Sequence, residues 1–552
     1  MSNRQNAAPA AASASPATRR ALAARWAGIA LALFLVNLMP SFHNVWPTPW
    51  ITLRPELSIE AAAIVLLIAI VAQRRTASAW LINGLAVVLM CLALARYLEV
   101  TAPALYGRAI NLYWDTQHLP AVASMLVDGI APGWIVAGGI AACGLLVLIY
   151  AALRWALRTL ASAADERRLL ASVAACLIGA YLLAYYASFA PVLRWFSIPV
   201  TQTYVRQIEF VAEALAGTSA AANLPAADPL AEWAWSGRPD VDVFVVFVES
   251  YGAVAYDAES VADTLEPHRA ALAAAAAEID AGIASAFVTS PTFGGVSWLA
   301  HASFMTGIDV TESGTYNLLL TQARETLADR FAAAGYRALA LMPGLRGDWP
   351  EGSFYGFDRI YGERDIAYTG PAFGWWRVPD QFALARLDDV EIDVAGRKPL
   401  FVFFPTISTH MPFRPTPPYQ PNWNALTGPE PYAEALLTDA ASAAPDLTNL
   451  RPAYAGALAY TYDYLCAYVR RLADREFVLL ILGDHQPPAS VAGEGARWDV
   501  PVHVVASDAA MLDAFTDAGF VEGIVPRAEP VARTHELGAR LLEALGAARA
   551  AQ

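Results

Sequence analysis

The sequence predicts two parts: an N-terminal bundle of five transmembrane helices, and a C-terminal α/β domain with a mostly parallel central sheet. Three observations predict this fold class. Long apolar stretches fill the first 190 residues, apolar runs alternate with helical patterns after residue 240, and 56% of the residues are hydrophobic. That hydrophobic content is too high for an ordinary soluble protein and is typical of a chain that is partly embedded in a membrane.

Charge and cysteine usage exclude several other classes. The formal net charge is -14, which disfavours nucleic acid as a partner because its phosphate backbone repels an acidic protein. Of the four cysteines, Cys91, Cys143 and Cys176 fall in apolar segments, and Cys466 stands alone in the soluble part. We therefore expect neither a disulfide framework nor a thiolate metal site.

Membrane spans need about 20 apolar residues each. Five candidate stretches lie near residues 21–40, 58–73, 78–97, 132–154 and 168–189, and the second is the shortest. The first stretch continues to Met39 without a small-residue cleavage site, so we expect a span and not a removable signal peptide.

Arginine placement predicts the orientation of these spans. Arg clusters precede the first span, separate the second from the third, and separate the fourth from the fifth. With five spans, all three clusters lie on one side, which the positive-inside rule makes the cytoplasmic side. The fifth span then delivers the rest of the chain to the outside.

The outside loop from about 98 to 131 is rich in aromatic residues, including Tyr106, Tyr113 and Trp114. One interpretation is an interfacial helix or a re-entrant segment, since Trp and Tyr commonly lie at the membrane interface. The other interpretation is that this loop forms a lipid-facing part of a substrate site.

The region after the fifth span connects the two parts. Residues 200–215 carry apolar side chains at helical spacing and predict an amphipathic juxtamembrane helix. Residues 217–239 are rich in Ala, Ser and Pro and predict a linker. The expected domains are a cytoplasmic tail at 1–20, a transmembrane domain at 21–190, a juxtamembrane helix and linker at 191–238, and a soluble domain at 239–546.

Apolar runs predict the strands of the soluble domain. They are Val241–Val248, Ala284–Val288, Arg337–Met342, Leu400–Pro405, Phe477–Leu482 and Val500–Ala506. Helical patterns at 262–278, 324–334 and 455–474 alternate with these runs. Such alternation predicts a mostly parallel sheet that is covered by helices on both faces.

Three candidate metal ligands directly follow two of these strands. Glu249 comes after Val241–Val248, and Asp484 and His485 come after the run that Gly483 closes. Because the carboxyl ends of parallel strands meet at one edge of a sheet, we expect these side chains to lie close together. Two carboxylates, an imidazole and a nearby hydroxyl suit Zn²⁺ or Mn²⁺ and allow Mg²⁺. The alternative for Asp484 and His485 is a loop pair that caps the next element.

Ser297 is the candidate nucleophile. It follows the strand at 284–288 and opens a short helix that ends at Gly307. Helix N-terminal amides and a divalent cation would both stabilise its alkoxide, and Gly294 and Gly295 would let an anionic substrate approach the backbone. The alternative is that Ser297 only caps the helix, a position at which serine is favoured.

His410, Arg346 and Trp349 also follow strands and are candidate substrate-binding residues. The imidazole of His410 is suited to proton transfer near neutral pH, so His410 is also a candidate catalytic residue. Arg346 would clamp an anion, and Trp349 would line the site. The alternative for His410 is a buried histidine whose hydrogen bonds are satisfied.

Several motifs together resemble one enzyme family. They are Val-Phe-Val-Glu249-Ser-Tyr-Gly, the Ser297 segment, Ser408-Thr-His410-Met-Pro-Phe and Leu-Gly-Asp484-His485. With the predicted membrane spans ahead of an α/β domain, the chain resembles lipoteichoic acid synthases and phosphoethanolamine transferases, which are sulfatase-like members of the alkaline-phosphatase superfamily. This resemblance implies that Glu249, Ser297, Asp484 and His485 bind one catalytic divalent ion and that His410 contacts substrate.

The sequence departs from the family pattern at the nucleophile, which is usually threonine. Other hydroxyls in this segment belong to Thr289, Ser290, Thr292 and Ser303. One alignment places Gly294 at the nucleophile position, but the spacing to Thr306-Gly307 resembles that of related phosphodiesterases and favours Ser297. The Cys-x-Pro-x-Arg signature of true sulfatases does not occur in the sequence, which counts against sulfate ester hydrolysis.

The resemblance implies a membrane-bound transferase with a phospho-Ser/Thr intermediate. Such an enzyme moves a phosphoglycerol- or phosphoethanolamine-type head group from a phospholipid donor to a glycan or lipid acceptor of the cell envelope. It is a multi-pass protein of the bacterial inner (plasma) membrane, and the domain at 239–546 is its periplasmic or extracytoplasmic catalytic domain. Two alternatives remain: a phosphodiester or sulfate ester hydrolase on the same scaffold, and a non-catalytic protein that binds the envelope.

Overall fold

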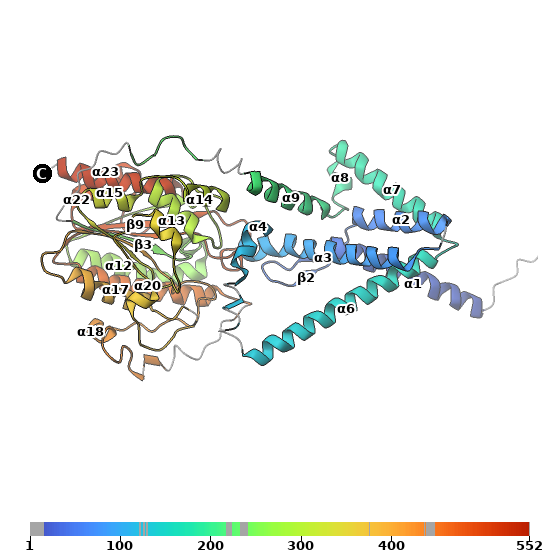
Figure 1. The fold of residues 1–552 in the computed structure, drawn as a ribbon, viewed down its shortest axis with the longest axis horizontal. Helices are drawn as coiled ribbons and strands as arrows, with labels where there is room; N and C mark the ends of the chain where they lie inside the picture. Colours follow the sequence, from blue (N-terminus) through green and yellow to red (C-terminus); the bar gives the residue numbers. More distant parts are fainter. Residues whose placement is uncertain are drawn as a thin grey trace, which may run out of the picture. The chain divides into compact units, whose positions relative to one another are not determined.

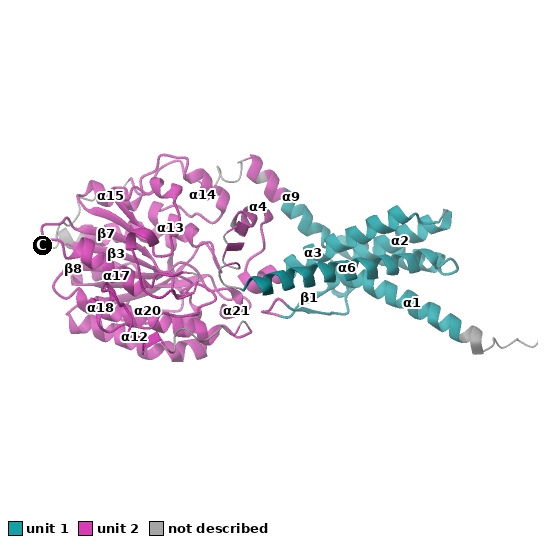
Figure 2. Ribbon diagram, turned by 60° about the horizontal axis from the view of Figure 1, so that its bottom comes forward, with its two compact units in different colours: residues 1–45, 50–100, 131–208 teal, residues 46–49, 101–130, 209–552 magenta. Residues whose placement is uncertain are grey.

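The chain folds into two compact units, which are coloured separately in Figure 2. The computed structural model describes residues 16–550 apart from 75, 121–122, 125–126, 128–130, 217–223, 232–240, 375, 435, 438–445 and 447. We call residues 1–45, 50–100 and 131–208 the helical unit, and residues 46–49, 101–130 and 209–552 the α/β unit. Most of the predicted tail at 1–20 and of the predicted linker at 217–239 lies outside the described residues.

The helical unit contains helices at all of the predicted apolar stretches. Its long helices are α1 (Pro16–Ser41), α2 (Ile59–Arg74), α3 (Ala79–Tyr106), α6 (Pro132–Ser162) and α7 (Arg167–Tyr186). Its other elements are β1 (His43–Asn44), β2 (Ile51–Thr52), α8 (Ala190–Leu193) and the first half of α9 (Thr201–Ala216).

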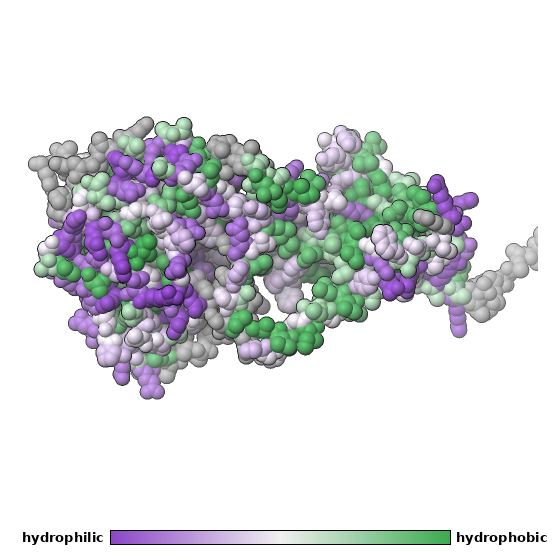
Figure 3. All heavy atoms as spheres, in the orientation of Figure 1, coloured by the Kyte–Doolittle hydropathy of each residue, from purple (hydrophilic) through white to green (hydrophobic). Residues whose placement is uncertain are grey.

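Four helices among the described residues are long and apolar enough to cross a membrane: α1, α3, α6 and α7. The fifth, α2, has only 16 residues, so the predicted count of five spans is not confirmed. Apolar side chains lie on the visible surface of this unit (Figure 3), and none of the most apolar window of α6 is buried. Exposed apolar surface on that scale is typical of helices that face lipid.

The α/β unit is built around a sheet that lies between two layers of helices (Figure 1). Within the described residues the sheet has nine strands, in the order β10-β4-β9-β8-β3-β7-β5-β6, with β11 beside β4. Its strands are β3 (Val241–Val248), β4 (Gly282–Thr289), β5 (Arg337–Leu341), β6 (Arg359–Tyr361), β7 (Leu400–Pro405), β8 (Glu476–Gly483), β9 (Asp499–Ala506), β10 (Val521–Glu522) and β11 (Pro530–Arg533). All six predicted strands are present. The sheet is parallel from β8 to β6, but β9 is antiparallel to both neighbours, so the sheet is mixed.

The register of β3 and β8 decides where the candidate ligands lie. The two strands are parallel neighbours, and Val248 is paired with Gly483. The next residues in the chain are therefore Glu249 on one strand and Asp484 on the other, side by side at the carboxyl edge of the sheet.

Helices cover both faces of the sheet, as the buried pattern of β3 requires. Phe244 and Val246 point into one hydrophobic cluster, and Val245 and Phe247 point into the opposite one. The first cluster is closed by α12 (Glu259–Glu278), α17 (Asp380–Leu387) and α20 (Arg451–Arg471). The second is closed by α13 (Ser297–Thr306), α15 (Leu327–Ala333), α22 (Ala509–Asp517) and α23 (Leu537–Ala550).

Short helical turns connect these layers. They are α4 (Leu112–Asp115), η1 (Thr116–His118), α11 (Val254–Asp257), α14 (Ser313–Leu319), η2 (Pro350–Phe354), α16 (Glu363–Ile366), η3 (Asp388–Ile392), α18 (Trp423–Leu426), α21 (Ala489–Ala492) and η4 (Thr534–Glu536). Two of them, α4 and α14, line a cavity of about 480 Å³ beside the segment that leads into α13.

Candidate active site

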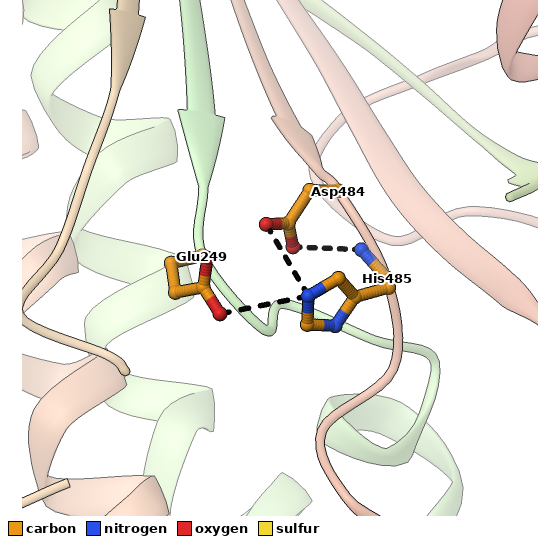
Figure 4. A group of neighbouring side chains, drawn as sticks. All are labelled: Glu249, Asp484 and His485. Carbon is orange, nitrogen blue, oxygen red and sulfur yellow. Dashed lines mark hydrogen bonds and ion pairs between the residues drawn. The ribbon is translucent and has the colours of Figure 1, made fainter. Parts of the chain in front are cut away.

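Glu249, Asp484 and His485 converge at the carboxyl edge of the sheet (Figure 4). One ligand atom from each lies within 4.8 Å of those of the other two, and all three residues are buried. The Nε2 atom of His485 lies 3.5 Å from Glu249 Oε1 and 3.6 Å from Asp484 Oδ2. The structure therefore brings together the three ligands that the sequence placed on two separate strands.

Ser297 completes this cluster from a third segment. Its Oγ donates a hydrogen bond to Glu249 Oε2 at 2.9 Å and lies 3.1 Å from His485 Nε2. Val296, the residue before it, has φ +66°, in the left-handed region that β-branched residues rarely adopt. This turn starts α13 at Ser297 and directs the hydroxyl to the cluster.

The other hydroxyls of this segment are engaged elsewhere. Ser290 donates to the carbonyl of Asp484, Thr292 to the carbonyl of Gly295, Ser303 to the carbonyl of Leu299, and Thr289 to Asp499 Oδ1. Of the candidate hydroxyls, Ser297 is the one that meets both Glu249 and His485. The geometry thus favours Ser297 over the alternatives that the sequence left open.

Buried hydrogen bonds hold Glu249 in place. Its backbone N–H donates to Thr406 Oγ1 at 3.1 Å, and its carbonyl accepts from Thr409 Oγ1 at 2.5 Å. The hydroxyl of Ser250 donates to Glu249 Oε1 at 2.9 Å. These contacts fix both the backbone and the carboxylate, as is usual for the residues that support a metal ligand.

Asp484 and His485 are oriented by their own neighbours. Asp484 Oδ1 accepts from the backbone N–H of Ser250 at 2.8 Å and of His485 at 2.7 Å. The His485 Nδ1–H donates to the carbonyl of Gln486 at 2.7 Å, which leaves the lone pair of Nε2 directed at the cluster. Burial lowers the pKa of His485, which keeps the ring neutral as a metal ligand requires.

The two carboxylates cannot both be ionised comfortably without a cation. Burial raises the pKa of Glu249, but the nearby His485 and His410 outweigh burial and lower this pKa to about 2. Burial and the adjacent Glu249 raise the pKa of Asp484 well above its usual range. Among the described residues, neither carboxylate forms an ion pair with Lys or Arg.

The donor set fits a divalent metal ion. Asp484 Oδ2 is buried and accepts no hydrogen bond from the residues that the structure describes. A buried oxygen without a donor is costly unless an ion binds it. Two carboxylates, a neutral imidazole and a hydroxyl are oxygen and nitrogen ligands of the kind that Zn²⁺ and Mn²⁺ accept.

His410 lies beside the cluster but does not belong to it. It follows β7, and its Nδ1–H donates to the carbonyl of Met411 at 2.7 Å, so Nε2 carries the lone pair. The ring lies close enough to Glu249 to lower the pKa of that carboxylate. The ring centroid lies 4.9 Å from that of Trp376.

Arg346 and Trp349 are not brought to the cluster. Arg346 lies 3.5 Å from Glu363. Trp349 stacks on Tyr355 with ring centroids 5.3 Å apart and packs against the hydrophobic core. Substrate binding by Arg346 and Trp349 stays a prediction.

Sequence reasoning missed a residue that supports the His410 turn. Asp380 is fully buried, and its carboxylate accepts from the backbone N–H of Ile407 at 2.9 Å and of Ser408 at 2.8 Å. Burial raises the pKa of Asp380 to about 6. The sequence around Asp380 carries no motif, and only its position in the fold shows this role.

Comparison with known proteins finds a family-model match within the α/β unit. Residues 242–504 match the family model described as Sulfatase. This range contains Glu249, Ser297, His410, Asp484 and His485. No curated protein matches the chain.

Several solved structures are similar to this chain at low sequence identity. The integral membrane lipooligosaccharide phosphoethanolamine transferase A from Neisseria meningitidis is 15% identical, with a TM-score of 0.47 over 94% of this chain and 95% of that one. The lipoteichoic acid synthase LtaP from Listeria monocytogenes is 13% identical, with a TM-score of 0.34 over 53% and 71%. The phosphoglycerol transferase GacH from Streptococcus pyogenes, in complex with sn-glycerol-1-phosphate, is 11% identical, with a TM-score of 0.38 over 60% and 80%.

Proposed function

We propose that this chain is a membrane-bound, metal-dependent phosphotransferase, because residues 242–504 match the Sulfatase family model and contain the cluster described above. It moves a phosphoglycerol- or phosphoethanolamine-type head group from a phospholipid to a glycan or lipid acceptor of the cell envelope. One observation carries the proposal: the Ser297 hydroxyl lies within 3.1 Å of both Glu249 and His485, beside Asp484. A nucleophile and a set of metal ligands are thus assembled at one point.

Glu249, Asp484, His485 and Ser297 would hold one divalent ion, with Mn²⁺ or Zn²⁺ as the first choices and Mg²⁺ as a third. When bound, this ion lowers the pKa of a ligating hydroxyl and stabilises negative charge on the transferring phosphate. The rest of the chemistry belongs to the side chains of this chain.

In the first half-reaction, Ser297 Oγ attacks the phosphorus of the donor. The Ser297 hydroxyl already donates to Glu249 Oε2, so this carboxylate is the nearest acceptor for its proton. A bond forms between Oγ and phosphorus, and the bond from phosphorus to the diacylglycerol oxygen breaks. The product is a phosphoserine diester that still carries the head group, and the start of α13 supplies amides that stabilise its charge. When the acceptor later displaces Ser297 Oγ, Glu249 returns its proton to this oxygen.

His410 would donate a proton to the leaving oxygen and accept a proton from the attacking oxygen. Its imidazole is half-buried and lies close enough to the cluster to lower the pKa of Glu249, and an imidazole is the side chain best suited to proton transfer near neutral pH. In the first half-reaction it protonates the leaving diacylglycerol oxygen. In the second half-reaction the neutral ring accepts the proton of the acceptor hydroxyl, which attacks the phosphoserine.

We also propose that α2 crosses the membrane, with the cytoplasmic tail at 1–20, the transmembrane domain at 21–190 and the catalytic domain at 239–546 outside the bacterial plasma membrane. With α2 as a fifth span, the Arg clusters share the cytoplasmic side and the catalytic domain lies outside. With four spans, the domain would lie inside. Labelling a cysteine introduced at Glu529, an exposed position of the α/β unit, with an impermeant reagent on intact cells tests this prediction.

The phosphoserine intermediate tests the proposed reaction. We expect the full chain, incubated with Mn²⁺ and a head-group-labelled phospholipid, to retain label on the Ser297 peptide. Ser297→Ala should lose the label, Ser297→Thr should keep it, and the neighbouring control Thr292→Val should keep it. Label on another residue, or diacylglycerol release by Ser297→Ala at the wild-type rate, would refute the mechanism.

Product analysis separates the transferase from its alternatives. A transferase yields diacylglycerol and a modified acceptor, whereas a hydrolase yields diacylglycerol and a free phosphorylated head group. A non-catalytic envelope-binding protein yields neither product at any metal concentration.

A further inference from the structure

Residues 250–252 form the turn that follows β3, and this turn touches both carboxylates of the candidate metal site. The backbone N–H of Ser250 donates to Asp484 Oδ1 at 2.8 Å, and the Ser250 hydroxyl donates to Glu249 Oε1 at 2.9 Å. Ser250 has φ +57°, in the left-handed region that is unfavourable for a residue with a side chain. A turn in this conformation needs support from the residues that pack against it.

Tyr454 supports this turn from α20. Its hydroxyl donates to the carbonyl of Ser250 at 2.9 Å and accepts from the backbone N–H of Gly252 at 3.4 Å. Tyr454 is fully buried, and burial raises the pKa of its hydroxyl, so the group keeps the proton that it donates. One hydroxyl group therefore joins the two sides of the turn.

The ring of Tyr454 contacts a second turn, the one that carries His410. The centroids of the Tyr454 and Phe413 rings lie 5.3 Å apart in an edge-to-face arrangement. The backbone N–H of Phe413 donates to the carbonyl of His410 at 2.8 Å and closes this turn. Phe413 is buried and has φ +66°, so the His410 turn also contains a residue in the left-handed region.

The turn after β3 packs directly against the segment that follows β8. A Cβ added at Gly483 would overlap the carbonyl oxygen of Tyr251, and one added at Gly252 would lie 2.7 Å from the Cα atom of Gln486. The turn at 250–252 and the segment that carries Asp484 therefore leave no space between them. A displacement of the turn should move both carboxylates of the cluster.

We propose that Tyr454 is a positioning residue for two parts of the candidate site. Its hydroxyl, through Ser250, holds the carboxylates of Glu249 and Asp484 at the spacing that a metal ion requires. Its ring, through Phe413, holds the turn that carries His410. The inference rests on the proposed phosphotransferase function and adds a residue to it. Ligands that are held in place before the ion arrives bind it more tightly, because ordering them on binding costs free energy.

Loss of the Tyr454 hydroxyl should loosen the turn without unfolding the domain. Tyr251, the middle residue of the turn, hydrogen-bonds through its own hydroxyl to Tyr462 on α20 and to His503 on β9, the latter at 2.9 Å. These contacts keep the turn attached to α20 when Tyr454 is changed. The carbonyl of Ser250 would then lack its buried donor, which favours a movement of the turn towards another partner.

Metal affinity tests the role of the hydroxyl. The full chain in detergent is stripped of metal with a chelator, dialysed, and titrated by calorimetry with Mn²⁺ and, separately, with Zn²⁺. We expect Tyr454→Phe, which keeps the ring and removes one oxygen atom, to weaken binding of the ion about 10- to 100-fold, the loss typical of residues that orient a metal ligand. Wild-type affinity in folded Tyr454→Phe overturns the inference.

The matched control is Tyr468→Phe on the same helix. Tyr468 is also fully buried, and its hydroxyl lies 3.2 Å from Asp388 Oδ1, about 21 Å further along the axis of α20. This variant loses a buried hydrogen bond of the same kind and should bind the ion with wild-type affinity. Denaturant unfolding in chelator compares the stability of the two variants. If Tyr468→Phe weakens metal binding as much as Tyr454→Phe does, the effect is one of general stability and the inference fails.

The ring contact is tested by Phe413→Leu, which also decides the inference if Tyr454→Phe does not fold. Phe413→Leu keeps the position apolar and removes the edge-to-face contact. We expect wild-type metal affinity and a rate of diacylglycerol release, at saturating metal, that is lower by about 10- to 100-fold, because His410 is displaced. A wild-type rate in this variant, or a loss of its metal affinity, overturns the inference.

Excess metal separates the two roles of Tyr454 and separates the inference from the proposed function. A high Mn²⁺ concentration should recover most of the rate that Tyr454→Phe loses at limiting Mn²⁺, and it should recover none of the rate that Phe413→Leu loses. A Tyr454→Phe defect that excess Mn²⁺ does not relieve overturns the inference and leaves the proposed function standing. If the wild-type chain binds neither ion and releases no diacylglycerol, the proposed function itself fails, and the inference fails with it.

Discussion

The two ends of β3 carry buried carboxylates, and only the one at the amino end has an arginine partner among the described residues. Asp242 is the second residue of the strand and is 5% exposed. Glu249 directly follows the last residue of the strand and is 8% exposed. Arg397 forms a two-pronged ion pair with Asp242, and the backbone N–H of Leu400 donates to the same carboxylate at 2.9 Å. Glu249 instead faces a second carboxylate, Asp484.

This difference separates an end of β3 at which the carboxylate is neutralised within the chain from an end that fits a metal ion. A buried carboxylate costs several kcal/mol unless it is paired. At the amino end, the chain supplies its own cation. At the carboxyl end, among the described residues, neither Glu249 nor Asp484 pairs with Lys or Arg, so the proposed metal ion would supply the missing positive charge.

The largest effect is expected from Asp484→Asn. This change removes one carboxylate ligand and should lower the rate of diacylglycerol release at least about a thousandfold, because a preorganised charge partner of the reacting group is lost. Metal content, measured by elemental analysis of the purified chain, should fall with the rate. Full activity with normal metal content would show that Asp484 is not a ligand.

The same chemical change at the other end of the sheet should give the opposite result. Asp242→Asn leaves the partly buried Arg397 guanidinium without its carboxylate partner and should lower the free energy of unfolding by about 1–3 kcal/mol. Metal content and rate per folded molecule should stay at the wild-type level. Denaturant unfolding checks the stability, and a loss of metal without a loss of stability would break the contrast between the two ends.

A third buried carboxylate, Asp380, accepts hydrogen bonds from the backbone amides of Ile407 and Ser408 and has no arginine partner among the described residues. Burial raises its folded pKa from 3.8 to about 6, so its contribution to stability is full below the unfolded pKa and is lost as pH rises to about 6. A shift of that size corresponds to about 3 kcal/mol. The stability of the wild-type chain relative to Asp380→Asn should therefore fall between about pH 4 and pH 6, as measured by denaturant midpoints. A constant difference over this range would contradict the raised pKa of Asp380.

The smallest effect concerns the stability of the chain with and without a metal ion at Glu249. In the presence of a chelator, Glu249→Gln should destabilise the chain by on the order of 1 kcal/mol, because the lowered pKa of Glu249 means that its ionised carboxylate is favoured in the folded state. With Mn²⁺ or Zn²⁺ added, the wild type should gain stability and this variant should gain little. Equal gains in both proteins would place the metal elsewhere.

The strands of the α/β unit were predictable because they are buried on both faces. The runs Val241–Val248 and Leu400–Pro405 match β3 and β7 residue for residue, since a strand covered by helices on both sides is apolar throughout. The short strands β6, β10 and β11 were missed because few of their residues are buried. The antiparallel placement of β9 was also missed, because strand direction leaves no trace in the composition of a buried run.

The cluster of candidate ligands was predictable for a topological reason. Residues that follow parallel neighbouring strands must meet at one edge, and Glu249 and Asp484 follow β3 and β8. The supporting residues were not predictable in this way. Asp380 acts through two backbone amides of a distant turn, and Gly107 acts by the absence of a side chain against Phe293. Such roles depend on tertiary contacts that no local pattern records.

Residues 101–130 belong to the α/β unit, although helices of the other unit precede and follow them in the sequence. A fragment excised at the start of β3 would keep every proposed metal ligand but would lose the segment that covers Phe293 and carries Trp114, which lines the cavity beside the start of α13. Inhibitor screening on such a fragment would then miss compounds that occupy this cavity. The intact membrane protein is the proper target for drug discovery and for crystallography of ligand complexes.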